Sequence, residues 1–107
     1  MVERREVVLA RVFFSDTPES KVRPAIILSD GRYNTGGSVL VAAVTTAGDE
    51  YCMEMNAEDA NCPLAEGSGA RFDGIIKMRS EQVARKIGKI TPKFHARLVE
   101  KIVGMIK

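Results

Sequence analysis

The sequence predicts a mainly β domain that ends in one α-helix, arranged as a small twisted barrel or sheet closed by that helix. Three observations predict this fold class. Short apolar runs alternate with turn-rich segments over most of the chain, a helix-start signal followed by helical spacing lies near the end, and the length of 107 residues suits one domain. We therefore expect residues 1–107 to form a single domain.

Apolar runs bounded by turn-forming residues predict six strands. They span residues 6–14, 25–28, 39–44, 51–55, 72–78 and 86–90. Pro24 stands where the second run begins, a place at which a strand tolerates proline. Arg23 is therefore expected where a loop becomes a strand, and Thr45 and Thr46 end the third run.

Polar segments rich in Gly, Pro, Asp and Ser predict the connections between these strands. Residues 15–22 are expected to form an exposed, mobile loop, and residues 29–38 a second turn-rich connection. Residues 56–69 are expected to be mostly loop with one helical turn near 57–60, and residues 80–84 a turn or a single helical turn.

The terminal helix is predicted from Thr91-Pro92, with threonine as N-cap and proline at the first helical position, where its missing N–H costs nothing. An apolar stripe at helical spacing follows, while the lysines and arginines between its members can face water. The stripe consists of Phe94, Leu98, Ile102 and Met105 or Ile106.

Composition excludes several classes of protein. Hydrophobic residues make up 45% and charged residues 28% of the chain, which is ordinary for a globular protein. No apolar run approaches the roughly 20 residues that span a bilayer, and no signal-peptide stretch precedes the first strand, so we expect a cytoplasmic protein without membrane contact. Cys52 and Cys62 lack zinc or redox spacing and are expected to be free thiols.

Charge is distributed unevenly along the chain. Between residues 47 and 73 there are seven acids and one base, Arg71, whereas from residue 74 onward nine bases stand against Glu81 and Glu100. A basic stretch is either a binding surface for a polyanion or an ordinary solvated surface, and charge alone favours neither.

Arg23 and Thr45 are the candidate catalytic residues. A guanidinium holds phosphate through two parallel hydrogen bonds and stays charged, whereas a threonine hydroxyl can hydrogen-bond a phosphate but is too weak an acid–base group to act alone. Considered singly, Arg23 is more simply interpreted as a surface arginine and Thr45 as an ordinary strand residue. His95, the single histidine, lies beside an apolar helix anchor and is expected to be structural or at the surface. Serine-hydrolase, phosphate-loop and dinucleotide motifs are missing.

Two segments resemble the MazF/PemK-type toxins. Residues 22–29, Val-Arg-Pro-Ala-Ile-Ile-Leu-Ser, are similar to the R-P-(apolar)-S strand of that family, and residues 41–46, Val-Ala-Ala-Val-Thr-Thr, to its following strand. The colinear resemblance covers most of the chain and is weakest between residues 47 and 71. Arg5-Glu6 and Asp73-Gly74 depart from the family's common pattern.

The resemblance implies an SH3-like or PemK-like twisted β-barrel with a C-terminal helix. It also implies a metal-independent endoribonuclease without cofactor, in which the 2′-hydroxyl of single-stranded RNA attacks phosphorus and leaves 2′,3′-cyclic phosphate and 5′-hydroxyl ends. Arg23 would be the phosphate clamp and candidate proton donor, with Thr45 as its hydrogen-bonding partner. The expected substrate-binding residues are Ser15, Ser20, Lys21, Thr46, Lys77 and Arg79.

The implied partners are a second copy of the chain, giving a homodimer, and an acidic antitoxin, whose complex with the toxin would bind DNA. An alternative of the same fold is a non-enzymatic toxin or binding module, for example a gyrase-binding protein, because fold alone does not decide function. RNA cleavage by the purified protein would separate the two hypotheses.

Overall fold

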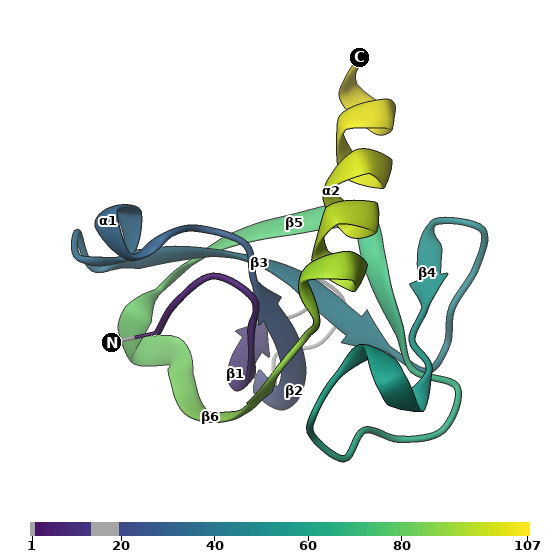
Figure 1. Cartoon of the computed structure of the whole chain (residues 1–107). Coiled ribbons are helices and arrows are strands. Elements are labelled where there is room, and N and C mark those ends of the chain that lie inside the picture. The colour runs from purple at the N-terminus through teal and green to yellow at the C-terminus, as the bar shows by residue number, and fades with distance from the viewer. Residues whose placement is uncertain (1, 14–19) are drawn as a thin grey trace.

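Six strands form one antiparallel sheet in the computed structural model, which describes residues 2–13 and 20–107 (Figure 1). Their order across the sheet is β4-β5-β3-β2-β1-β6, so β4 and β6 are edges that do not pair and the sheet stays open. The strands are β1 (Glu6–Phe13), β2 (Ser20–Ile27), β3 (Ser38–Thr45), β4 (Cys52–Glu54), β5 (Gly69–Arg79) and β6 (Val83–Lys89).

Strand β2 begins earlier than the sequence predicts. It starts at Ser20 and pairs with β1 along its length. Pro24 therefore lies inside the strand, opposite Leu9. The prediction that Arg23 ends a loop is therefore wrong, as is the loop assignment of residues 20–22, while residues 15–19 of that loop lie outside the described residues. On its other side β2 pairs with β3 only from Ala25 to Ile27, and a proline is tolerated where one side of a strand has no ladder.

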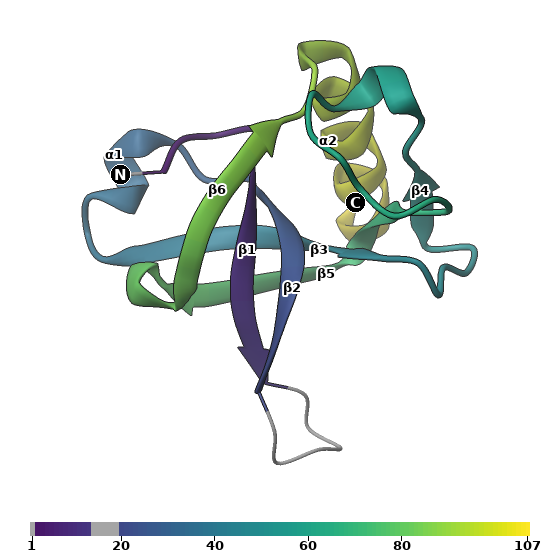
Figure 2. The same ribbon diagram turned by 90° about the horizontal axis from the view of Figure 1, so that it is seen from below.

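The sheet twists strongly, so β1 and β2 cross β3 and β5 at a steep angle (Figure 2). Strand β3 pairs with β5 along most of its length, with a shift of register between Ala42 and Val44. Beyond this bulge Val44 lies opposite Ala70 and Thr45 opposite Gly69. The extra residues belong to β5, which runs from Ile75 to Ala70 while β3 runs only from Ala42 to Val44, so the bulge bends β5.

Both faces of the central strands are buried, because neighbouring residues point to opposite sides of a strand. On one face, helix α2 (Pro92–Ile106) packs its residues Phe94, Leu98 and Ile102 against Val7 and Ile26. On the other face the curled sheet packs against itself. This second cluster contains Val8, Ala10, Ala25, Ile27, Val39, Val41 and Met78.

Helix α2 begins as predicted, with the Thr91 hydroxyl accepting a hydrogen bond from the Phe94 N–H at 3.1 Å and proline at the start. A one-turn helix, α1 (Gly31–Asn34), occupies part of the segment predicted as a turn, and Asp30 caps it. Single 3₁₀ turns, η1 (Ala57–Asp59) and η2 (Ser80–Gln82), lie where helical turns were expected. The mainly β fold class with a C-terminal helix is thus confirmed.

The two cysteines are free thiols, as predicted, but they are half-buried rather than buried. Burial raises the pKa of the Cys62 thiol. No helix among residues 2–13 and 20–107 is long and apolar enough to cross a membrane.

Candidate active site

Arg23 and Thr45 come together because of the register of β2 and β3. The last paired residues of these strands are Ala25 and Ala43. Continued by two residues on each strand, the same antiparallel register brings Arg23 opposite Thr45, with both side chains on the face of Ala25 and Ala43. The ladder stops before this point, so the two strands separate and leave space between them.

A cavity of about 320 Å³ lies at this point. Its apolar lining continues the cluster inside the curled sheet, and its polar lining comes from Arg23, Thr45 and Arg71. The lining residues are Arg23, Pro24, Ala25, Val41, Ala43, Val44, Thr45, Ala47, Arg71 and Ile76. An apolar cavity with a few convergent polar groups at the mouth of a β structure is typical of ligand-binding sites.

The two predicted catalytic side chains differ in environment. Arg23 is exposed, whereas Thr45 is half-buried. The Thr45 hydroxyl oxygen accepts a hydrogen bond from the Ala47 backbone N–H at 3.1 Å, which fixes the oxygen and leaves the hydroxyl proton to be donated elsewhere. The pair therefore offers a permanent cation and an oriented hydroxyl donor at one cavity.

Arg71 is a third polar residue of the cavity, and the sequence did not single it out as functional. It lies near the start of β5, beside Ala70, which packs in the core beneath α2. Strand alternation therefore turns Arg71 to the opposite, cavity side. Its strand extends further towards the N-terminus than the apolar run at residues 72–78 indicated.

None of the predicted substrate-binding residues whose side chains the structure describes lines this cavity. Thr46 is exposed directly after Thr45. Lys77 and Arg79 lie opposite Leu40 and Ser38 on β3, so they alternate with the cavity-lining Ile76 and point to the other side of β5. Three further predicted residues cannot be placed at the side-chain level: Ser15 lies outside the described residues, and only the backbone of Ser20 and Lys21 is described.

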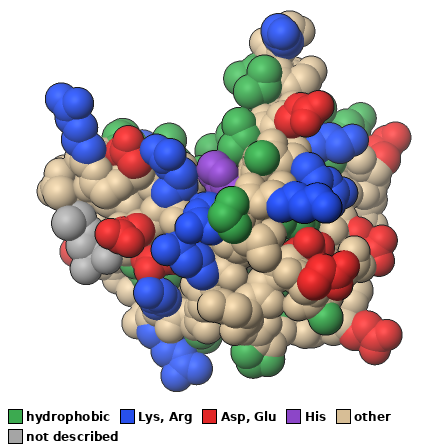
Figure 3. Space-filling model, viewed as in Figure 1, with side chains coloured by type: hydrophobic (Ala, Val, Ile, Leu, Met, Phe, Trp, Pro, Cys, Tyr) green, Lys and Arg blue, Asp and Glu red, His purple; other side chains and the backbone are tan. Residues whose placement is uncertain are grey.

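His95 lies outside the cavity, on the face shown in Figure 3, where Lys and Arg side chains gather near it. It is half-buried, and burial together with the positive charges of Arg4 and Arg5 lowers its pKa. These positive neighbours disfavour the protonated imidazole. Its position agrees with a structural or surface role.

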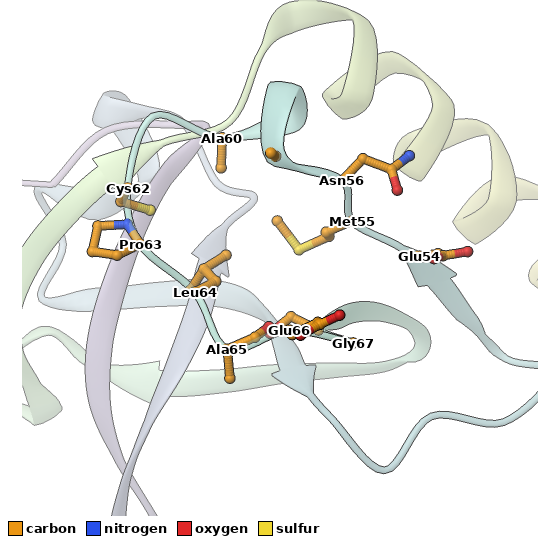
Figure 4. A pocket seen from close by; sticks show the side chains of 12 residues that line it. Glu54, Met55, Asn56, Ala60, Cys62, Pro63, Leu64, Ala65, Glu66 and Gly67 are labelled. Atoms are coloured by element: carbon orange, nitrogen blue, oxygen red, sulfur yellow. The ribbon is translucent and has the colours of Figure 1, made fainter.

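A larger cavity, of about 500 Å³, is lined by residues of the segment 54–68 (Figure 4). None of the predicted site residues lines it. Met55, Cys62 and Leu64 also pack against the core beneath α2, so this cavity is enclosed by the loop that covers that core. Within the described residues, no group of three or more His, Cys, Asp or Glu side chains is arranged to hold a metal ion.

The fold and the cavity define a class of small, mainly β proteins with an open curved sheet and a C-terminal helix. Solved structures in this class include an endoribonuclease in complex with its cognate antitoxin from a mycobacterial species, with a TM-score of 0.80 and 16% identity over 99% of this chain and 95% of that one. The Mycobacterium tuberculosis toxin MazF-mt6 gives a TM-score of 0.75 and 22% identity over 94% of each chain.

The MazE–MazF complex of Deinococcus radiodurans contains a further similar chain, with a TM-score of 0.77 and 16% identity over 98% of this chain and 94% of that one. Because the sequence identities are this low, the similar structures establish the fold alone. A comparison with curated protein sequences gives no significant match. The sequence profile of the PemK-like, MazF-like toxins of type II toxin–antitoxin systems matches residues 3–106, and the chain belongs to this family.

Proposed function

We propose that this protein is a metal-independent endoribonuclease toxin of a type II toxin–antitoxin system. The observation that carries the proposal is that Arg23 of β2 and Thr45 of β3 line one cavity, just beyond the last paired residues of the two strands. Family membership supports it, and so do the similar structures described as endoribonucleases.

In the proposed reaction the 2′-hydroxyl of single-stranded RNA attacks the adjacent phosphorus. The new P–O2′ bond forms as the P–O5′ bond breaks, the 2′-hydroxyl proton passes to a solvent water, and the leaving 5′-oxygen takes a proton from Arg23, which regains one from water. The products are a 2′,3′-cyclic phosphate and a 5′-hydroxyl. The need for a 2′-hydroxyl makes the reaction selective for RNA over DNA.

Arg23 stabilises the charge that develops on the non-bridging phosphate oxygens, since a guanidinium donates two parallel hydrogen bonds and is charged when the substrate binds. It is also the candidate proton donor to the leaving oxygen. Thr45 donates its hydroxyl proton to a phosphate oxygen and keeps the group oriented towards Arg23. Thr46, Ser15, Ser20, Lys21, Lys77 and Arg79 remain proposed contacts of the RNA strand.

Cleavage of a long RNA in EDTA by the wild-type protein and by Arg23→Ala and Thr45→Ala tests the assignment. Removing one preorganised donor from such a site costs about 10²–10³ in rate, so both variants should lose activity by that order. Arg32→Ala and Thr35→Ala, exposed positions on or beside α1, are matched controls that should cleave like the wild type. Undiminished cleavage by both site variants would refute the roles, and loss of wild-type cleavage in EDTA would refute the metal-free mechanism.

An antitoxin is the proposed protein partner. The similar mycobacterial endoribonuclease is bound to its cognate antitoxin, and the Deinococcus chain is part of a MazE–MazF complex. We propose that the antitoxin of this protein is an acidic chain that covers basic surface and blocks the cavity. Co-expression of the neighbouring short reading frame should suppress cleavage, and cleavage that continues unchanged would argue against that partner.

A further inference from the structure

Arg71 is held rigidly in the wall of the cavity that contains Arg23 and Thr45. Its Nε donates to Asp73 Oδ1 at 2.9 Å and its Nη2 to Asp73 Oδ2 at 3.0 Å, a two-point contact. Nη2 also donates to Asp49 Oδ2 at 3.2 Å, and Nη1 lies 3.5 Å from the Cys52 sulfur. A long side chain fixed in this way loses little further conformational entropy when it binds a ligand.

Two carboxyl groups surround the Arg71 guanidinium. Hydrogen bonds from the Tyr51 backbone N–H, and then from Arg71, lower the pKa of Asp49, while the bonds to Asp73 and then Asp49 raise the pKa of Arg71. Asp49 and Arg71 therefore stay ionised at neutral pH, and the cluster sets one guanidinium against two carboxyl groups. A guanidinium already bound to two carboxylates attracts a further anion weakly, but its remaining N–H can still donate to a neutral acceptor.

The rest of the cavity suits the flat face of a nucleobase. The half-buried Pro24, Ala43 and Ile76 provide accessible apolar lining, and Arg71 adds a donor at its side. Apolar surface against the ring and one hydrogen bond to its edge is a common way to hold a base of single-stranded RNA.

We propose that Arg71 is a specificity-determining residue that donates a hydrogen bond to a carbonyl or ring-nitrogen acceptor of the base next to the scissile phosphate. This proposal rests on the proposed ribonuclease function. Asp73 and Asp49 are the positioning residues that aim the guanidinium. Arg71 selects the base, whereas Arg23 and Thr45 act on the phosphate.

Cut-site profiles on a long mixed-sequence RNA test the proposal. The wild-type protein should prefer particular bases beside the cut, and Arg71→Gln should lower that preference roughly fivefold or more, since one directed contact to a base edge is worth about 1–3 kcal/mol of discrimination. Arg32→Gln, an exposed arginine on α1, carries the same charge change and should keep the wild-type profile. Arg71→Lys should restore only part of the preference, because an ammonium lacks the fork held by Asp73.

A second variant tests whether Asp73 matters by orienting the Arg71 guanidinium or only by its negative charge. Asp73→Asn removes one negative charge beside the cavity and weakens the two-point contact. We expect it to bind RNA more tightly than the wild type at low salt but with a relaxed base preference. A purely structural role for the cluster would change thermal stability and leave the base profile as it is.

Binding of uncleavable oligonucleotides, with a 2′-deoxy residue at the cut site and each of the four bases beside it, completes the test. If Arg23→Ala abolishes cleavage while Arg71→Gln keeps the wild-type base profile, the specificity proposal is refuted and the ribonuclease proposal stands. If the wild type cleaves no RNA, the ribonuclease proposal is refuted and with it the place of Arg71 beside a scissile phosphate; base-dependent binding that is lost in Arg71→Gln would then show Arg71 to be a base-binding residue only. Binding without any base preference refutes the Arg71 proposal in either case.

Discussion

At the scale of single residues, close packing decides which positions accept change. Gly88 of β6 lies against the segment that follows η1, where the Asn61 side chain accepts a hydrogen bond from the Lys89 N–H at 2.7 Å. A Cβ at Gly88 would come within 2.8 Å of both Asn61 Oδ1 and Cys62 Sγ. Gly104, on α2, has no atom within 4 Å of such a Cβ.

These two glycines give a matched pair of stability predictions. Gly88→Ala should destabilise the protein by about 1–3 kcal/mol, because the added methyl group overpacks against a loop that is itself hydrogen-bonded to β6. Gly104→Ala should stabilise it by about 0.5–1 kcal/mol, since alanine favours the helix. Chemical denaturation measures both, and a neutral Gly88→Ala would show that residues 61 and 62 can move away without cost.

At the scale of elements, an ion pair joins the edge strand β6 to β1. The Lys86 ammonium lies 2.6 Å from the carboxylate of Glu6, which is only 5% exposed, and the Glu3 N–H donates to the other oxygen. Burial opposes ionisation of Glu6, but the bonds from Lys86 and Glu3 outweigh it and lower the pKa of Glu6 below its ordinary 4.5.

The direction of this shift predicts a pH dependence. A carboxyl group whose pKa is lower in the folded state stabilises the fold above its unfolded pKa, and this contribution is lost as pH falls through the folded pKa. Thermal stability of the wild type should therefore fall from about pH 4.5 downward. Glu6→Gln should be less stable at pH 7 and show a smaller loss on acidification, measured by thermal melts between pH 7 and 3. An identical acid profile in the two proteins would contradict this account.

Strand positions were predictable from apolar runs, but strand ends were not. The core portions of β1, β3 and β6 and the start of α2 follow local patterns of residues, so the sequence indicates them. The polar start of β2 is extended only because β1 pairs with it. Likewise β5 begins at Gly69 because β3 and β4 pair with it there, which is why Arg71 was missed as a cavity residue. Pairing between distant segments leaves no local signal.

The juxtaposition of Arg23 and Thr45 depends on the same long-range pairing. Each residue looked ordinary by itself, and the sequence suggested only that both lie at strand edges. The pairing of β2 with β3 places the two residues near each other, because both lie two positions beyond the last residue pair, Ala25 and Ala43. Conversely, because side chains alternate between the two faces of β5, Lys77 and Arg79 point away from the cavity. The number of basic residues in this part of the sequence does not indicate to which face they point.

At the scale of the whole molecule, the cavity forms where the curled sheet stops pairing. Strands β2 and β3 are paired over three residue pairs and then diverge, while beyond the bulge in β5 the end of β3 still pairs with Ala70 and Gly69. The interior of the sheet is apolar up to this point and becomes polar at its mouth. The fold thus presents polar strand ends beside an apolar pocket without any added domain.

The family also leads us to propose a homodimer. Sedimentation at micromolar concentration should give a particle of twice 11.7 kDa. Repeating the measurement in 0.1 M and 1 M salt will show whether polar contacts contribute, since salt screens exposed charges. A monomer under both conditions would contradict the dimer.

The central claim, that Arg23 and Thr45 promote attack by the RNA's own 2′-hydroxyl, is tested most directly by the chemistry of the cut ends. An RNA oligonucleotide containing the mapped cut site should be cleaved in EDTA to fragments with 2′,3′-cyclic phosphate and 5′-hydroxyl ends. The same oligonucleotide with one 2′-deoxy residue at the cut site should remain intact. Cleavage of the 2′-deoxy substrate, or fragments carrying 5′-phosphate ends, would contradict the account.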